Sequence, residues 1–196
     1  MKRYACLIFG LFLPATLLAF DCNPKPVLPD NAFPTVKFET SMGDIEVELN
    51  RMRAPATVNN FLSYVVEGAY DGTIFHRVIK DFVVQGGGYH ADWKEVPQHE
   101  PVMNESGNGL LNNAWTIAMA RMDDPHSATN QFYFNVKDNA GLNPDPRHWG
   151  YTVFGDVVSG REVLEAIAAV PTGYNEDVDF QDVPQVAVTL LHVTVE

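Results

Sequence analysis

Cysteine is almost absent from this sequence, and its scarcity excludes several classes of protein. Among the 196 residues only Cys6 and Cys22 are cysteines, and Cys6 lies in an N-terminal segment that we expect to be removed. The mature chain therefore cannot close an internal disulfide. The sequence also lacks a C-x-x-C pair, a G-x-S-x-G elbow and a metal-spaced histidine pair. These absences argue against a dithiol redox site, a serine hydrolase and a metal centre.

Positive charge is scarce as well. The 13 lysines and arginines are outnumbered by 25 aspartates and glutamates, so the formal net charge is -12. Removal of Lys2 and Arg3 with the N-terminal segment changes this charge from -12 to -14. An acidic surface repels phosphate backbones and anionic lipid headgroups. We therefore expect no nucleic-acid partner and no stable membrane insertion of the mature chain.

Long hydrophobic runs are confined to the N-terminus. A basic pair precedes residues 4–20, which are almost entirely apolar and end near the small residue Ala19. This pattern is typical of a secretory signal peptide, so we predict a signal peptide over residues 1–20 and localisation in the periplasm, with secretion beyond the cell as the alternative. A membrane span competes with this interpretation, but the run is at the short limit for crossing a bilayer. A lipid anchor at Cys22 is disfavoured because Asp21 precedes it.

The rest of the chain suits a single domain. Residues 21–34 carry four prolines and no periodicity, so we expect an extended lead-in. The domain would then cover residues 35–196. After a turn at 40–43, apolar residues in the segment 45–49 alternate with acidic ones, which predicts a β-hairpin with one face in water.

Two segments change to a helical period. The first, 53–70, has apolar residues at i, i+3, i+4 and i+7, and Pro55 suits its first turn. The second, 159–173, carries an apolar stripe, and Ser159 and Glu162 have the spacing of a capping box. We therefore predict two short amphipathic helices.

Short strands account for most of the remaining domain. They read TIFHRVI, DFVVQGG, WTIAMAR, NQFYFNV, YTVFGDVV and PQVAVTLLHVTVE. With the hairpin they make about eight strands, and no regular strand-helix alternation suggests a parallel sheet. The expected fold is mainly β, a closed eight-stranded antiparallel β-barrel capped by two α-helices. The bulky strand residues predict a filled interior, which disfavours a barrel that binds a small ligand.

Five motifs follow one another along this domain. They are FHRVIKDFVVQGG, NESGNGLLN, TIAMAR, SATNQFYFNV and GYTVFGDVVSG, and they span nearly the whole domain. Each motif alone is a weak signal, but their combination and order are highly specific. On these motifs the sequence resembles the cyclophilins, which are peptidyl-prolyl cis/trans isomerases, and within them the exported bacterial branch.

The resemblance implies a site and the roles of its residues. Arg77 matches the arginine that acts on the proline amide, and Phe82 and Gln85 complete the implied catalytic set. The turn at 80–81 would bring both beside Arg77. The implied substrate-binding residues are Val83, Ala120, Arg121, Met122, Gln131, Tyr133, Leu142 and Tyr151. No cofactor and no metal are implied.

Amide rotation explains why these residue types belong together. Rotation of a peptide bond is opposed by about 18–20 kcal/mol because nitrogen shares its lone pair with the carbonyl. Catalysis needs no bond to break; it requires only that the twisted amide be bound more tightly than either planar form. The twisted nitrogen regains its lone pair, so a fixed donor aimed at it stabilises that state, and a permanently protonated arginine supplies one. Phe82, Val83 and Leu142 would hold the proline ring in an apolar pocket with Tyr133.

Some positions depart from the family pattern. Gly141 stands where the family carries tryptophan, so we predict weak or no inhibition by cyclosporin. Tyr133 replaces phenylalanine and brings a hydroxyl that needs a partner. Arg121 replaces asparagine, and Tyr151 takes the place of the usual histidine.

Neighbouring residues have structural interpretations. Successive strand residues face opposite sides, so Phe132 and Phe134 should point into the core, whereas Gln131 and Tyr133 share the other face. His76 is expected to be structural. The glycines at 86–88 predict a turn with positive φ or a close backbone approach.

The predicted function is isomerisation of X-Pro bonds in exported proteins by a monomeric chain. Its partners would be proline-containing unfolded or partly folded exported polypeptides. The alternative is a peptide-binding chaperone that retains the groove without turnover, for which Gly141 and Tyr133 are the only hints.

Overall fold

The computed structural model describes residues 26–196, which form β-strands joined by turns and a few helices. The strands are β1 (Thr35–Thr40), β2 (Gly43–Leu49), β3 (Arg77–Ile79), β4 (Val83–Gly86), β5 (Thr116–Met119), β6 (Phe132–Asn135), β7 (Val153–Ser159), β8 (Thr172–Asn175), β9 (Phe180–Pro184) and β10 (Leu190–Val195). The α-helices are α1 (Pro55–Val66) and α2 (Arg161–Ala168), and two 3₁₀ turns are η1 (Ser106–Asn108) and η2 (Ala140–Leu142).

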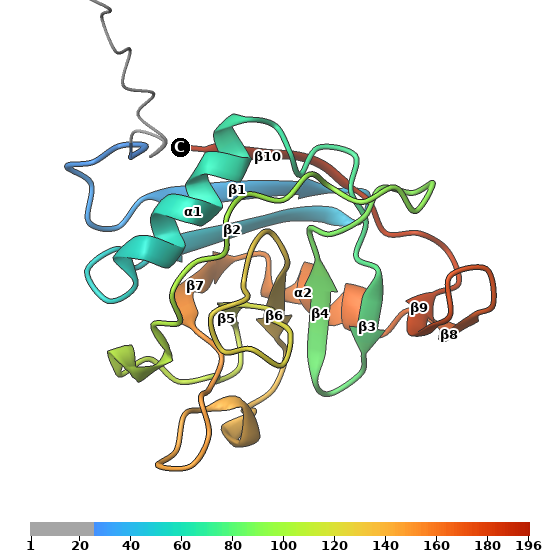
Figure 1. Ribbon diagram of the computed structural model, residues 1–196. Helices are drawn as coiled ribbons and strands as arrows, with labels where there is room; N and C mark the ends of the chain where they lie inside the picture. Colours follow the sequence, from blue (N-terminus) through green and yellow to red (C-terminus); the bar gives the residue numbers. More distant parts are fainter. Residues whose placement is uncertain (1–25) are drawn as a thin grey trace, which may run out of the picture.

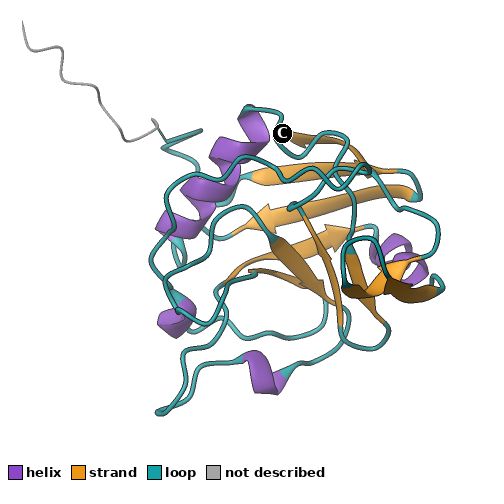
Figure 2. Ribbon diagram, turned by 45° about the vertical axis from the view of Figure 1, so that its right-hand side comes forward, coloured by secondary structure: helices purple, strands orange, loops and turns teal. Residues whose placement is uncertain are grey.

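Eight of these strands make one curled antiparallel sheet (Figure 1). Their order is β10-β1-β2-β7-β5-β6-β4-β3. Figure 2 shows α1 at one end of the curled sheet and α2 at the other. The predictions of a mainly β fold, an antiparallel eight-stranded sheet and two helices are therefore confirmed.

The prediction of a closed barrel is wrong, because the edge strands β10 and β3 do not pair with each other. The segments just before them meet at a single bridge between Ile74 and Thr189. Between α2 and β10 the chain forms a separate β8–β9 hairpin, and β9 lies against β3. This hairpin packs beside β3, one of the two edge strands of the sheet.

The inside of the curl is filled by aromatic rings. The ring centroid of Phe38 on β1 lies 5.5 Å from that of Phe132 and 5.4 Å from that of Phe134, both on β6. All three side chains are fully buried. The prediction that Phe132 and Phe134 face the core is confirmed, and the filled interior excludes the small-ligand barrel.

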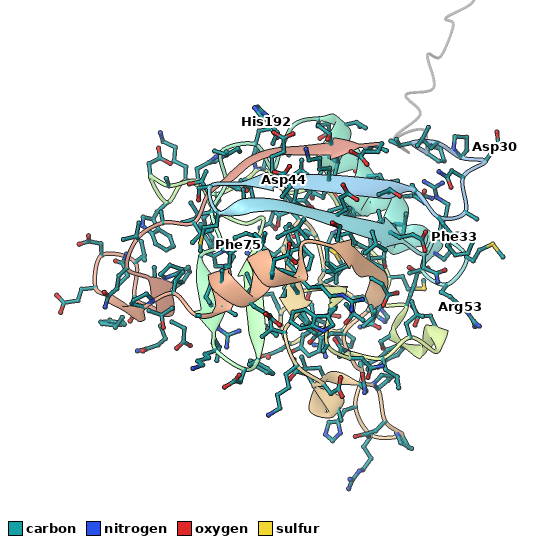
Figure 3. The ribbon with its side chains drawn as sticks, turned by 180° about the vertical axis from the view of Figure 1, so that it is seen from behind. Asp30, Phe33, Asp44, Arg53, Phe75 and His192 are labelled. Atoms are coloured by element: carbon teal, nitrogen blue, oxygen red, sulfur yellow. The ribbon has the colours of Figure 1, made fainter. Side chains whose placement is uncertain are left out.

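The two helices begin in different ways. Helix α1 begins at Pro55, as the sequence predicted. The predicted capping box of α2 is wrong: Ser159 belongs to β7, and the N-cap is Gly160 with a left-handed φ of 83°. The reason is a close approach, because a Cβ on Gly160 would lie 2.2 Å from the carbonyl oxygen of Asp44. Figure 3 shows α2 next to β2, the strand that carries Asp44.

The chain that leads into β1 is tied to the domain. Residues 26–34, the described part of the predicted lead-in, contain turns and bends. The guanidinium of Arg51 donates to the carbonyl oxygens of Val27, Leu28 and Asn31. The predicted signal peptide over residues 1–20 lies outside the described residues, as does Cys22. Within 26–196, none of the helices combines the length and hydropathy required to cross a membrane.

Candidate active site

One row of side chains crosses five strands on the face of the sheet that points away from the core. The register of the strands aligns Arg77 (β3), Gln85 (β4), Tyr133 (β6), Ala118 (β5) and Val153 (β7). A pocket of about 270 Å³ lies over this row. Its lining residues are Arg77, Phe82, Val83, Gln85, Ala120, Arg121, Tyr133, Leu142 and Tyr151. Nine of the eleven residues that the resemblance implied therefore meet at one site, on the outer face of the sheet.

The turn between β3 and β4 brings the polar residues of the pocket together. Asp81 adopts a left-handed φ of 57° in this turn, and the amide of Phe82 donates to the carbonyl of Ile79 at 3.1 Å. The resulting register places Gln85 directly opposite Arg77. The prediction that this turn sets Phe82 and Gln85 beside Arg77 is confirmed.

The guanidinium of Arg77 is oriented by a chain of hydrogen bonds. Its Nη1 donates to Oε1 of Gln85 at 3.3 Å, and Nε2 of Gln85 donates to Oε1 of Gln131 at 2.9 Å. Gln131 is not among the lining residues and reaches the pocket only through Gln85. The side chain of Arg77 is 41% exposed, so it can reach a bound peptide.

Asp182 is a site neighbour that the sequence analysis missed. Its Oδ2 lies 4.0 Å from Nε of Arg77, across from Gln85. It belongs to β9, where its φ is 60°. The segment FQDVP before the last strand could have predicted a further strand. No pattern in the sequence relates that segment to Arg77, which lies about 100 residues earlier.

The wall opposite Arg77 is apolar, with one buried hydroxyl. Tyr133 is 4% exposed, and its hydroxyl donates to Oδ1 of Asn112 at 2.7 Å, so the group that replaces a phenylalanine hydrogen has a partner. Burial raises the pKa of Tyr133 well above its ordinary value, so the hydroxyl remains a donor. Its ring meets that of Tyr151 edge-on at 5.9 Å.

Arg121 braces two loops at the rim of the pocket. Its guanidinium carbon lies 4.6 Å from the ring centroid of Tyr151. Nη1 donates to the carbonyl of Met122 at 2.8 Å and Nη2 to that of Trp149 at 2.9 Å. Met122 lies outside the pocket lining, and 77% of its surface is exposed.

His76 and the glycines after β4 support the site from behind. The imidazole of His76 is buried and its Nδ1 has no hydrogen-bond partner. Burial, with a smaller contribution from the charge of Arg77, lowers the pKa of His76 to about 4. Gly87 has a φ of 82°, and a Cβ on Gly88 would lie 2.6 Å from Nε2 of Gln131. The predicted positive φ and close approach are therefore confirmed.

Together the fold and the pocket define a class of site. The pocket of about 270 Å³ combines aromatic and aliphatic side chains with Arg77, Gln85 and Arg121, and its lining contains no nucleophile paired with a base. Within residues 26–196 no group of three histidine, cysteine, aspartate or glutamate side chains is arranged to hold a metal ion. Such a site is suited to bind a peptide and stabilise a change of its shape.

Comparisons with known proteins agree with this description. The family model described as cyclophilin type peptidyl-prolyl cis-trans isomerase matches residues 35–195. Peptidyl-prolyl cis-trans isomerase cyp18 of Streptomyces antibioticus is 54% identical over 153 residues, which cover 76% of this chain and 91% of that protein. Peptidyl-prolyl cis-trans isomerase B of Escherichia coli is 47% identical over 163 residues, with 82% and 98% covered.

A solved structure shares the fold. The crystal structure of a cyclophilin type peptidyl-prolyl cis-trans isomerase from Cryptosporidium parvum superposes with a TM-score of 0.69 at 23% identity, and covers 84% of this chain and 98% of its own. The chain belongs to the cyclophilin-type peptidyl-prolyl cis-trans isomerase family. Its activity is peptidyl-prolyl cis-trans isomerisation.

Proposed function

We propose that this protein isomerises X-Pro bonds in exported, unfolded or partly folded polypeptides, with the proline ring bound in the 270 Å³ pocket beside Arg77. The observation that carries the proposal is the cross-strand row that sets Arg77 and Gln85 at one end of the pocket and the rings and aliphatic side chains at the other. A second crystal structure of the Cryptosporidium parvum cyclophilin was obtained in the presence of the dipeptide Ala-Pro, which supports a proline peptide as ligand.

Arg77 is the proposed catalytic donor. As the amide twists, its nitrogen becomes an acceptor, and a guanidinium already held by Gln85 stabilises that state without reorganising. Tyr133, Leu142 and Phe82 hold the proline ring and exclude water, which strengthens the interaction with the charge. A rate gain of about 10⁵ requires roughly 7 kcal/mol, which one charged hydrogen bond and restraint of the rotating group together can supply.

A chymotrypsin-coupled assay on an X-Pro peptide tests this role. We expect Arg77→Ala to lower kcat about 100-fold to 1,000-fold, the loss typical of removing one preorganised donor. Arg161→Ala is the matched control, because Arg161 lies on α2 and outside the pocket lining. A wild-type rate equal to that in solvent would instead favour the non-catalytic chaperone, and an active Arg77→Ala variant would remove Arg77 from the mechanism.

Export to the periplasm is the second part of the proposal. The basic pair followed by the apolar run of residues 4–20 supports it, and the acidic net charge of -12 disfavours nucleic acid as a partner. The mature protein works as a monomer without a cofactor. N-terminal sequencing of the protein from fractionated cells is the test: a periplasmic chain that begins near Phe20 supports export, and a cytoplasmic chain that retains Met1 contradicts it.

A further inference from the structure

Three buried asparagines lie beneath the apolar wall of the pocket. Asn112, Asn135 and Asn139 are 1%, 0% and 8% exposed, and they come from the loop before β5, the end of β6 and the residue before η2. Burying amide groups is costly unless each finds partners. Their partners include four of the pocket-lining residues.

Asn112 is the centre of this network. Its Oδ1 accepts hydrogen bonds from the hydroxyl of Tyr133 at 2.7 Å and from Nδ2 of Asn135 at 3.2 Å. Its Nδ2 lies 3.2 Å from the carbonyl oxygen of Leu142 and 3.4 Å from that of Tyr151. One side chain thus connects three residues of the pocket wall that belong to β6, η2 and the loop before β7.

Asn139 connects the fourth lining residue. Its Nδ2 donates to the carbonyl of Phe82 at 3.0 Å and to Oδ1 of Asn135 at 2.7 Å. Asn135 in turn donates to Oγ1 of Thr116 at 2.9 Å. The network therefore runs from the β5–β6 ladder to both sides of the apolar pocket.

Only an amide at position 112 can serve all these partners. The Tyr133 hydroxyl donates and needs an acceptor, whereas the carbonyls of Leu142 and Tyr151 accept from a donor, and an asparagine supplies both. The Leu142 carbonyl also accepts from the backbone amide of Tyr151 at 3.0 Å. The loop that carries Leu142 has no ladder partner of its own within the described chain, since η2 is a three-residue turn. Bonds from backbone amides also hold this loop, among them the one from the Asn112 backbone amide to Oδ1 of Asn143 at 2.7 Å, but the side chain of Asn112 is what joins the loop to the Tyr133 hydroxyl.

We propose that Asn112 is a positioning residue for the isomerase: it fixes the Tyr133 ring and the Leu142 backbone at the separation that fits a proline ring. The inference rests on the proposed binding of proline in this pocket. Arg77 lies at the other end of the row and makes no contact with Asn112, so loss of the network should weaken substrate binding more than it slows turnover.

Steady-state kinetics on a soluble X-Pro peptide test the inference. We expect Asn112→Ala to raise KM about tenfold and to change kcat less than threefold, the reverse of the pattern for Arg77→Ala. Tyr133→Phe, which removes only the hydroxyl, should raise KM about threefold. In the double variant the KM increase should be smaller than the product of the two single increases, because both substitutions remove the same hydrogen bond.

A second asparagine separates positioning from general stability. Asn60 on α1 donates from Nδ2 to the carbonyl of Thr129 at 2.6 Å and does not line the pocket. Asn60→Ala should lower Tm and leave KM unchanged. The inference is overturned if Asn112→Ala likewise lowers Tm without raising KM, or if its effect multiplies independently with that of Tyr133→Phe.

Two further outcomes are also decisive. If Asn112→Ala does not fold, Tyr133→Phe decides alone: a raised KM at unchanged Tm supports the inference, and an unchanged KM overturns it. An inactive wild-type protein would defeat the proposed function, whereas an active wild type with a KM insensitive to both substitutions would defeat only the role of Asn112.

Discussion

The side chains on the two faces of strand β6 differ in the interactions that hold them. On the inner face Phe132 and Phe134 are fully buried and contact other rings. On the outer face Tyr133 joins a hydrogen-bond chain that leads to Asn112, and Gln131, just before the strand, joins one that leads to Arg77. The apolar contacts of the inner face are non-directional, so they tolerate small changes in orientation. The hydrogen bonds of the outer face require a few polar atoms to lie at defined distances and angles. Stability and catalysis are therefore separated across a single strand.

Truncating the inner face should have the largest effect on stability. Phe132→Ala removes a ring that contacts Phe38, Phe61 and Tyr70, so we expect a loss of about 3–5 kcal/mol in the free energy of unfolding. Urea denaturation measures this loss. If the faces are separate, the folded variant keeps the KM of the wild type; a KM raised tenfold would contradict the separation.

Acid should weaken the protein through His76, which is buried just before β3. Its pKa in the folded protein is about 4, below the ordinary value of 6.5, so the unfolded chain binds the proton first as the pH falls. Stability is therefore fully present above about pH 6.5 and declines down to about pH 4, by up to about 3 kcal/mol.

The pH dependence can be isolated by substitution. His76→Gln should unfold in urea with a smaller difference between pH 7 and pH 4.5 than the wild type shows. Equal differences in the two proteins would mean that other groups account for the acid sensitivity.

Introducing an aromatic ring at position 141 should strengthen the binding of cyclosporin on the outer face. A Cβ on Gly141 would meet no atom within 4 Å, so a side chain can leave the backbone here, next to Leu142, without a clash. We expect cyclosporin to inhibit the wild type weakly and Gly141→Trp at least tenfold more strongly. Nanomolar inhibition of the wild type would show that this position does not limit binding.

The smallest effect is expected at Asp182. Its carboxylate is 4.0 Å from Nε of Arg77, and both side chains are 41% exposed, so solvent screens the pair. Asp182→Asn should change kcat/KM less than threefold at low salt and not at all at 0.5 M salt. A tenfold loss that persists at high salt would give Asp182 a larger part in orienting Arg77.

Local sequence patterns predicted the arrangement of the site better than they predicted whether the sheet closes into a barrel. Alternation along the strands predicted the two faces of β6, and the turn at 80–81 predicted the meeting of Arg77 with Gln85. Both depend on neighbours in sequence, or on one short hairpin. The capping box at Ser159 had the right spacing, but contact of Gly160 with the β2 strand overrode it.

Distant contacts were decided only by the tertiary structure. The sequence by itself determined the strands of the main sheet and the two helices, because periodicity and turn chemistry are local properties. The family motifs, through the resemblance they carry, implied most of the pocket residues, whereas strands β8 and β9 were not predicted. Whether the edge strands β3 and β10 pair is a contact between segments far apart in sequence, and packing of the β8–β9 hairpin beside β3 brings Asp182 to Arg77. The partnership of Tyr133 with Asn112 joins residues 21 apart in sequence, so only the folded chain reveals what the additional hydroxyl binds.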